Sequence, residues 1–192
     1  MGRYGAVMAE AFDMLDHIRR SRVVRELLAG WFEFDIDRAD PVEPIRLGSG
    51  APVRVIAGEG AGGSYYVSGS RRWPAAVGYA SSEGCAGQFA VDLPAALEVI
   101  IALPYWNDQA ILSMADDIGE MRSAAAGLES ELREYCPGID SQRARLRSEL
   151  RMHAVPIGEV LSRLHERLVE PDPTHVLVGP DGSRYERLFS PS

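Results

Sequence analysis

The sequence contains no lysine, only two cysteines and only four histidines, and each low count argues against certain classes of function. All 20 basic residues are arginine, which, together with abundant alanine and glycine, indicates the codon usage of a GC-rich genome rather than a binding device. Two cysteines, Cys85 and Cys136, are too few for a disulfide framework, so we expect a reduced, cytosolic setting. The histidines never form the i, i+4 pair of a zinc protease, so no metal site is predicted; they are His17, His153, His165 and His175.

Basic residues are also outnumbered by acidic ones, 20 to 28. The 28 acidic residues give a net charge of -8 at pH 7 and a pI near 5.0. Nucleic acids and anionic membranes attract proteins with excess positive charge, so neither is a predicted partner, whereas a basic protein is. The same charge also serves solubility alone.

Long hydrophobic runs are missing as well. No run reaches the ~18 apolar residues of a membrane span. The N-terminus, MGRYGAVMAEAFDMLDHIRR, is charged throughout and lacks the apolar core of a signal peptide. We therefore expect a cytoplasmic protein.

The 192 residues, 46% of them hydrophobic, can fill the core of one domain. We expect an α+β fold in which an antiparallel sheet packs with an N-terminal and a central helix. The predicted parts are an α+β core over residues 1–106, a helical extension over 107–170 and a terminal hairpin over 171–192.

Apolar residues recur at helical spacing over Ala6–Ala29, which predicts the first helix, with Gly30 as its C-cap. The run Trp31, Phe32 and Phe34 fits either a strand or an aromatic staple onto this helix. Residues 35–50, rich in Pro and Asp, are predicted to form a loop that touches the sheet near Pro44–Leu47.

A glycine-rich turn, GEGAGGS over Gly58–Ser64, lies between predicted strands Pro52–Ala57 and Ser64–Ser68. Its glycines match G-x-G-x-x-G, and Glu83 follows at the distance of a ribose-binding acid. Such motifs hold phosphate at a helix N-terminus, yet the residues after this turn favour a strand, and Ser64 replaces the P-loop lysine. We predict a hairpin turn with residues at positive φ; the alternative is a small nucleotide-binding enzyme.

The segment Trp73–Asp108 is the most apolar of its length and is predicted to lie at the centre of the core. Strands Ala75–Ala80 and Gly87–Val91 flank a turn at Ser81–Gly84. Small residues on one face of the first strand are expected to let a helix pack close. The helix that follows is capped by Asp92, has Pro94 in its first turn and ends at Pro104, and its predicted inward side chains are Leu93, Leu97, Ile100 and Ile101.

Within this segment, YASSEG at Tyr79–Gly84 and LPYWND at Leu103–Asp108, together with the glycine turn, resemble Smi/Knr-like proteins of the SUKH superfamily, actinobacterial type. The resemblance covers about residues 50–110. It implies an α+β fold with an antiparallel sheet against helices. Many members of that superfamily look like immunity proteins that neutralise toxins, often nucleases, and others like regulators or scaffolds, so no catalytic residues are implied.

Apolar residues then recur at alternating spacings of three and four residues. This pattern predicts a helix of roughly seven turns over 107–135, which ends at Cys136–Gly138. The seam comprises Ile111, Met114, Ile118, Met121, Ala125, Leu128, Leu132 and Tyr135. We expect it to be buried within the chain; a homodimeric scaffold is the alternative.

Two further helices are predicted, one capped by Asp140 or Ser141 and one beginning near Pro156. The last hairpin, with its turn at Gly179–Ser183, is expected to pair locally, away from the main sheet.

No catalytic constellation emerges. Cys85 is interpreted as core packing, Ser81 and Ser82 lack a G-x-S-x-G elbow, and the acidic run Asp116, Asp117 and Glu120 is interpreted as a solvated helix face. We therefore predict a protein-binding module without catalysis or cofactor, whose partner is a protein such as a basic toxin domain.

The predicted partner-binding patch combines the Glu83 turn and the corner Tyr105–Asp108, with Trp73 and Trp106 as aromatic anchors. The alternative is that Trp73, Tyr105 and Trp106 only fasten the helix ends to the sheet. The residues at stake are Trp73, Glu83, Tyr105, Trp106 and Asp108.

Overall fold

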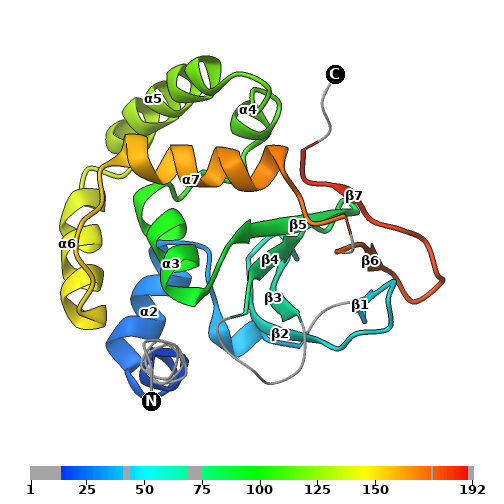
Figure 1. The fold of residues 1–192 in the computed structure, drawn as a ribbon. Coiled ribbons are helices and arrows are strands. Elements are labelled where there is room, and N and C mark those ends of the chain that lie inside the picture. Colours follow the sequence, from blue (N-terminus) through cyan, green and yellow to red (C-terminus); the bar gives the residue numbers. More distant parts are fainter. Residues whose placement is uncertain (1–13, 41–43, 69–74, 174, 190–192) are drawn as a thin grey trace, which may run out of the picture.

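The computed structural model describes residues 14–40, 44–68, 75–173 and 175–189, and every structural statement below concerns these residues. Helices cover one side of a five-stranded sheet, and a two-stranded sheet lies beyond its other side (Figure 1). The main hydrophobic core fills the space between the large sheet and the helices. The predicted α+β class is confirmed.

The large sheet runs in the order β2-β3-β4-β5-β7. Its first four strands form an antiparallel meander, whereas β7 pairs in parallel with β5. The sheet is therefore antiparallel, as predicted, except at this edge. The strand bounds are β2 Val53–Gly58, β3 Ser64–Ser68, β4 Val77–Ala80, β5 Cys85–Ala90 and β7 Glu186–Arg187.

The two faces of β4 differ as its alternation predicts. Val77 and Tyr79 enter the main core, but the opposite face does not receive a helix. At Gly78 an added Cβ would overlap the ring of Tyr66, which is fully buried. The small residue makes room for a tyrosine from the neighbouring strand, so the expected helix packing on this face is wrong.

The first predicted helix is not continuous. A helix over residues 14–20 ends before Ser21, and α2 spans Arg22–Trp31. The Ser21 hydroxyl accepts the Val24 N–H at 3.3 Å, a side-chain cap that begins a new helix. The helical period continued through Ser21 and concealed the break; residues 6–13 lie outside the described residues.

The aromatic run after α2 fastens the helix to the sheet. Phe32 and Phe34 are buried, and Asp35 forms an antiparallel bridge with Gly58. A short 3-10 helix, η1 Ile36–Arg38, follows. The aromatic-staple interpretation is therefore correct for Phe32 and Phe34, whereas Trp31 is 38% exposed.

The predicted contact of Pro44–Leu47 with a sheet involves the smaller one. β1 Arg46–Leu47 pairs with β6 Leu177–Val178 in the two-stranded sheet. Leu47 and Leu177 pack with Tyr66 in a second core cluster. The loop thus contributes a strand to a separate sheet.

α3, Leu93–Ala102, follows the prediction closely. The Asp92 carboxylate accepts the Ala95 N–H at 2.9 Å, and Pro94 occupies the first turn. Leu93, Leu97, Ile100 and Ile101 are fully buried. This helix supplies the centre of the core.

The single long helix predicted over 107–135 is wrong. The chain forms α4 Gln109–Leu112 and α5 Ile118–Tyr135, and the Asp117 side chain caps α5 by accepting the N–H groups of Gly119 and Glu120. Of the predicted seam, Met121 is fully buried in the core, whereas Tyr135 is 80% exposed. The continuous seam required by a homodimeric scaffold is therefore missing from the described helices.

The next two helices are α6 Ile139–Leu150 and α7 Ile157–Val169. α7 begins where predicted, and α5 ends at Tyr135 before Cys136. α6 begins after Gly138 without a side-chain cap, so neither Asp140 nor Ser141 caps it. Asp140 lies in the first turn, where its carboxylate binds Arg133 instead.

The predicted C-terminal hairpin forms, but its arms pair with strands of both sheets. Its turn is closed by the Gly179 N–H bonded to the Ser183 carbonyl at 2.9 Å, with a bridge between Val178 and Arg184. One arm joins β1 and the other joins β5, where the Glu186 N–H donates to the Gly84 carbonyl at 2.8 Å. The expected separation from the main sheet is wrong because β5 offers it an unpaired edge.

Candidate functional site

The glycine turn leads into a strand. β2 and β3 pair antiparallel across Gly58 and Ser64, so this turn does not lead into a helix N-terminus as a phosphate-binding glycine motif requires. Among the turn's glycines only Gly62 has positive φ, at +97°. Gly63 serves a different need, because an added Cβ would overlap the Tyr79 hydroxyl and the Glu59 carboxylate.

A buried polar cluster surrounds this turn. Glu59 is 8% exposed, and its carboxylate accepts hydrogen bonds from the Tyr79 hydroxyl and, at 3.2 Å, from the Asn107 amide. Burial raises the pKa of Tyr79, and the bond to Glu59 raises it further, so the phenol stays a donor. The cluster fastens the corner at Asn107 to the turn, and the role it supports is structural.

The structure divides the predicted site residues. Trp73 lies outside the described residues. Trp106 is 1% exposed and stacks on Phe89 with ring centroids 4.2 Å apart, so its prediction as an exposed anchor is wrong and the fastening alternative is correct for it. Tyr105 is half-buried, and its hydroxyl donates to Glu129 at 2.9 Å. Large aromatic side chains contribute most to stability when they are buried. The sequence alone did not show which of these rings would be buried.

Glu83 and Asp108 are exposed and flank the same turn. Ser82 lies beside Gly62, where an added Cβ would sit 3.5 Å from the Ser82 Cβ, and Asn107 binds Glu59. The structure thus brings the Glu83 turn and the Asp108 corner to one end of the sheet, as the predicted patch requires.

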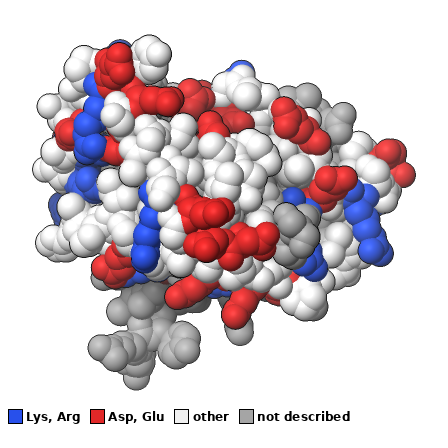
Figure 2. Space-filling view, turned by 90° about the horizontal axis from the view of Figure 1, so that it is seen from above, with Lys and Arg blue, Asp and Glu red and all other residues white. Residues whose placement is uncertain are grey.

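Further carboxylates extend this region. We define the acidic corner as the exposed residues Asp108, which precedes α4, Asp116 and Asp117, which lie between α4 and α5, and Glu120, in the first turn of α5. The view from above shows many acidic side chains on this face of the molecule, together with several arginines (Figure 2). Between Trp73 and Met121 the sequence contains no Arg, Lys or His, and Arg122 is the first basic residue after this stretch. This uneven distribution of charge is visible in the sequence and distinguishes the stretch from the rest of the chain.

A shallow, open groove lies beside the acidic corner. Met114, 38% exposed, lines it together with Asp117 and Glu120. An exposed thioether beside carboxylates offers an adaptable apolar contact within a charged surround. Through Met114, the groove gives this surface an apolar side chain that can contact a partner, a role that the predicted aromatic anchors do not fill.

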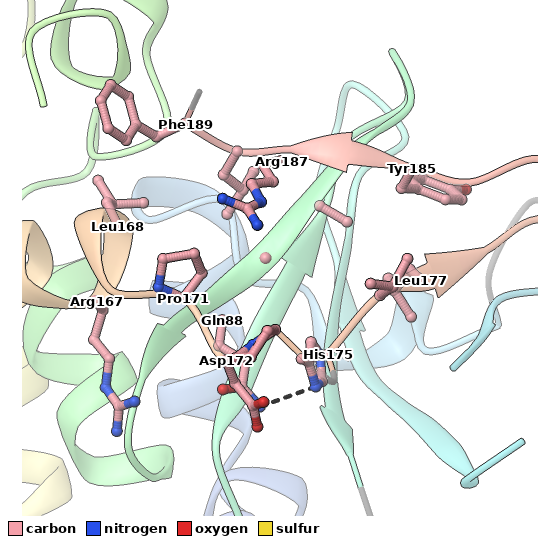
Figure 3. Close-up of a pocket in the computed structure, with 15 residues that line it drawn as sticks. Gln88, Arg167, Leu168, Pro171, Asp172, His175, Leu177, Tyr185, Arg187 and Phe189 are labelled. Carbon is pink, nitrogen blue, oxygen red and sulfur yellow. Dashed lines mark hydrogen bonds between the residues drawn. The ribbon is translucent and has the colours of Figure 1, made fainter. Parts of the chain in front are cut away.

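A second hollow, which we call the terminal pocket, lies between β5, the end of α7 and the C-terminal segment (Figure 3). His175 forms its polar wall. One ring nitrogen is 3.0 Å from the Tyr66 hydroxyl, and the other is 3.0 Å from the Gln88 amide nitrogen. This residue therefore connects the C-terminal segment to both β3 and β5.

His175 makes stability depend on pH. Burial lowers its pKa, although nearby Asp172 opposes the shift. The unfolded imidazole titrates near ~6.5, so between that value and its lower folded pKa the unfolded state binds the proton more tightly. We expect the stabilisation to be present above about pH 6.5 and lost as pH falls, and urea unfolding at about pH 7.5 and 5.5 measures it.

His175→Asn should flatten this pH dependence, whereas His153→Asn, which alters an exposed histidine, should leave it unchanged. Equal slopes for wild type and His175→Asn would contradict the assignment.

Among the described residues, no group of three or more His, Cys, Asp or Glu side chains could hold a metal ion, and no described helix has the length and apolarity to cross a membrane. No protein-family model, curated protein or solved structure matches the chain. The SUKH resemblance therefore stays a prediction.

Proposed function

We propose that this protein is a non-catalytic binding module that captures a basic protein partner through the acidic corner and its groove. The supporting observation is the set of exposed carboxylates at Asp108, Asp116, Asp117 and Glu120, in a stretch of sequence without a basic residue. Such a surface attracts a positively charged partner over a distance and speeds its capture.

The acidic corner is also held in place. Asp108 and Asp117 each accept backbone N–H bonds at a helix start, at 2.8 Å and 2.6 Å for the shortest ones. Two of the four carboxylates are thus oriented before a partner arrives. Orienting groups beforehand lowers the entropy cost of association, which favours tight binding.

A toxin that acts on nucleic acid is the partner class that we propose within this function. Proteins that bind nucleic acid present basic surfaces to the phosphate backbone. An acidic module could cover such a surface and block it. The resemblance to immunity proteins of the SUKH superfamily agrees with this proposal.

The test compares two variants of equal net charge. One neutralises the acidic corner with Asp108→Asn, Asp116→Asn, Asp117→Asn and Glu120→Gln, where asparagine can still cap the helices. The other neutralises exposed carboxylates elsewhere, with Glu131→Gln, Glu134→Gln, Glu149→Gln and Glu170→Gln. Both are compared with wild type as bait in cell extract, and association rates are measured with the captured partner.

We expect the acidic-corner variant to bind about tenfold or more slowly at low salt, because electrostatic steering is lost. The control variant should keep most of the wild-type rate, and the wild-type rate should fall with added salt. Equal losses in both variants, or none in the first, would refute the proposal.

A further inference from the structure

The terminal pocket has the dimensions of a site for a small molecule. Its volume is about 60 Å³. An enclosed water needs roughly 10–15 Å³ of such space, so the pocket has room for about four to six non-hydrogen atoms. Its apolar wall is formed by Leu168, Leu177, Leu188 and Phe189, which are all buried.

The polar groups of the pocket come from separate parts of the chain. Gln88 lies on β5, His175 precedes β6, and Arg187 ends β7. Both ring nitrogens of His175 are occupied by Tyr66 and Gln88, and burial lowers its pKa, so His175 is a neutral part of the wall. Arg187, an exposed residue at the end of β7, is a charged group of the lining that is available to a ligand.

The charge balance of the pocket is positive, although the protein is acidic. Two guanidinium groups, Arg167 and Arg187, line it with one carboxylate, Asp172, which has interactions of its own. Neither arginine forms an ion pair within the described parts of the chain, whereas Arg143 and Arg163 each do. Arg187 lies among the lining residues, whereas the Arg167 guanidinium points away at the margin (Figure 3).

We propose that the terminal pocket binds a small carboxylate, with its anionic end on Arg187 and its carbon end against Leu177 and Leu188. A planar guanidinium matches a carboxylate with two parallel hydrogen bonds. The apolar wall favours a short carbon chain over a fully polar ion, and the volume limits the ligand to about six non-hydrogen atoms. A ligand here contacts both β5 and the C-terminal segment, so its binding stabilises their pairing.

The probes are acetate, pyruvate, benzoate and acetamide, titrated at constant pH and ionic strength while NMR follows the Gln88 side-chain amide and the Leu188 methyl groups. We expect saturable shifts with acetate and pyruvate. Benzoate is too large, and acetamide is a neutral molecule of the same size as acetate, so neither should shift these signals. Shifts of equal size with acetamide would show that charge plays no part and would overturn the proposal.

Arg187→Gln should weaken acetate and pyruvate binding at least about tenfold, because a charge-assisted pair is lost. Arg184→Gln removes an exposed arginine on the same hairpin and should bind like wild type. Equal affinities for Arg187→Gln and wild type would also refute the site. The comparison of acetate with acetamide uses the wild-type protein alone, so it decides the question even if a variant folds poorly.

Discussion

Trp106→Ala is expected to lower the free energy of unfolding by about 3–5 kcal/mol, as truncations of buried large aromatics do. The ring is 1% exposed and lies between Phe89, at 4.2 Å, and Tyr79, at 5.3 Å between centroids. Truncation leaves a cavity beside Tyr79 and Phe89 that surrounding side chains can fill only in part. Urea unfolding followed by circular dichroism measures the change.

Tyr135→Ala is the matched control, because that aromatic ring is 80% exposed at the end of α5. Its effect should stay within about 0.5 kcal/mol. A Trp106→Ala protein with wild-type stability but impaired partner binding would contradict the core assignment and restore Trp106 as an anchor.

Arg143→Ala is expected to cost up to about 5 kcal/mol, because it removes the buried cationic partner of a buried carboxylate, which keeps only the more exposed Arg133 as an ion-pair partner. The Arg143 guanidinium holds both Glu129 oxygens, at 2.6 Å and 2.8 Å, and donates to the Ile101 and Ala102 carbonyls at 3.0 Å each. These carbonyls are at the C-terminal end of α3, where helical partners are missing. One side chain thus ties α6 to α5 and closes the end of α3.

The protonation of Glu129 reflects the same contact. Burial alone would raise its pKa, but the hydrogen bonds from Arg143 and Tyr105, together with the charges of Arg143 and Arg133, outweigh burial and leave the pKa below its ordinary value. Glu129 therefore stays ionised at neutral pH, and removing Arg143 leaves this buried carboxylate with two remaining partners, Arg133 at 2.8 Å and the Tyr105 hydroxyl.

Two comparisons test this explanation. Arg145→Ala, on the exposed side of α6, should change stability by less than about 0.5 kcal/mol. The double variant Arg143→Met with Glu129→Leu should be more stable than Arg143→Ala, because it removes both charges. A double variant as unstable as the single one would argue that the carbonyl bonds, not the ion pair, carry the effect.

Short sequence motifs correctly predicted the helices and turns that are determined by residues close together in the chain. Asp92 and Pro94 specify the start of α3, and the glycines of the β2–β3 turn specify a hairpin because Tyr65 and Tyr66 favour a strand. Helix breaks were harder to predict. Apolar spacing continued through Ser21 and Asp117, and only the capping bonds of these side chains show that each begins a new helix.

The remaining features depend on contacts between distant residues. The spacing of β4 could not show that Gly78 faces Tyr66, and no local pattern reveals that β7 pairs with β5. For the site, Glu83 and Asp108 were placed correctly as exposed residues, whereas burial of Trp106 follows from the packing of Phe89 against it. A count of charge along the chain would have found the acidic corner.

The parallel pairing of β5 with β7 has a consequence for synthesis. Cys85 and its partner Glu186 are separated by about a hundred residues, so the β2–β5 meander can form long before its outer strand exists. During that interval the backbone groups of β5 are open to strands of neighbouring nascent chains, and an uncovered edge is a site of aggregation. Slow translation of residues 90–186 would lengthen this exposure, so the yield of soluble protein should depend on the codons chosen there.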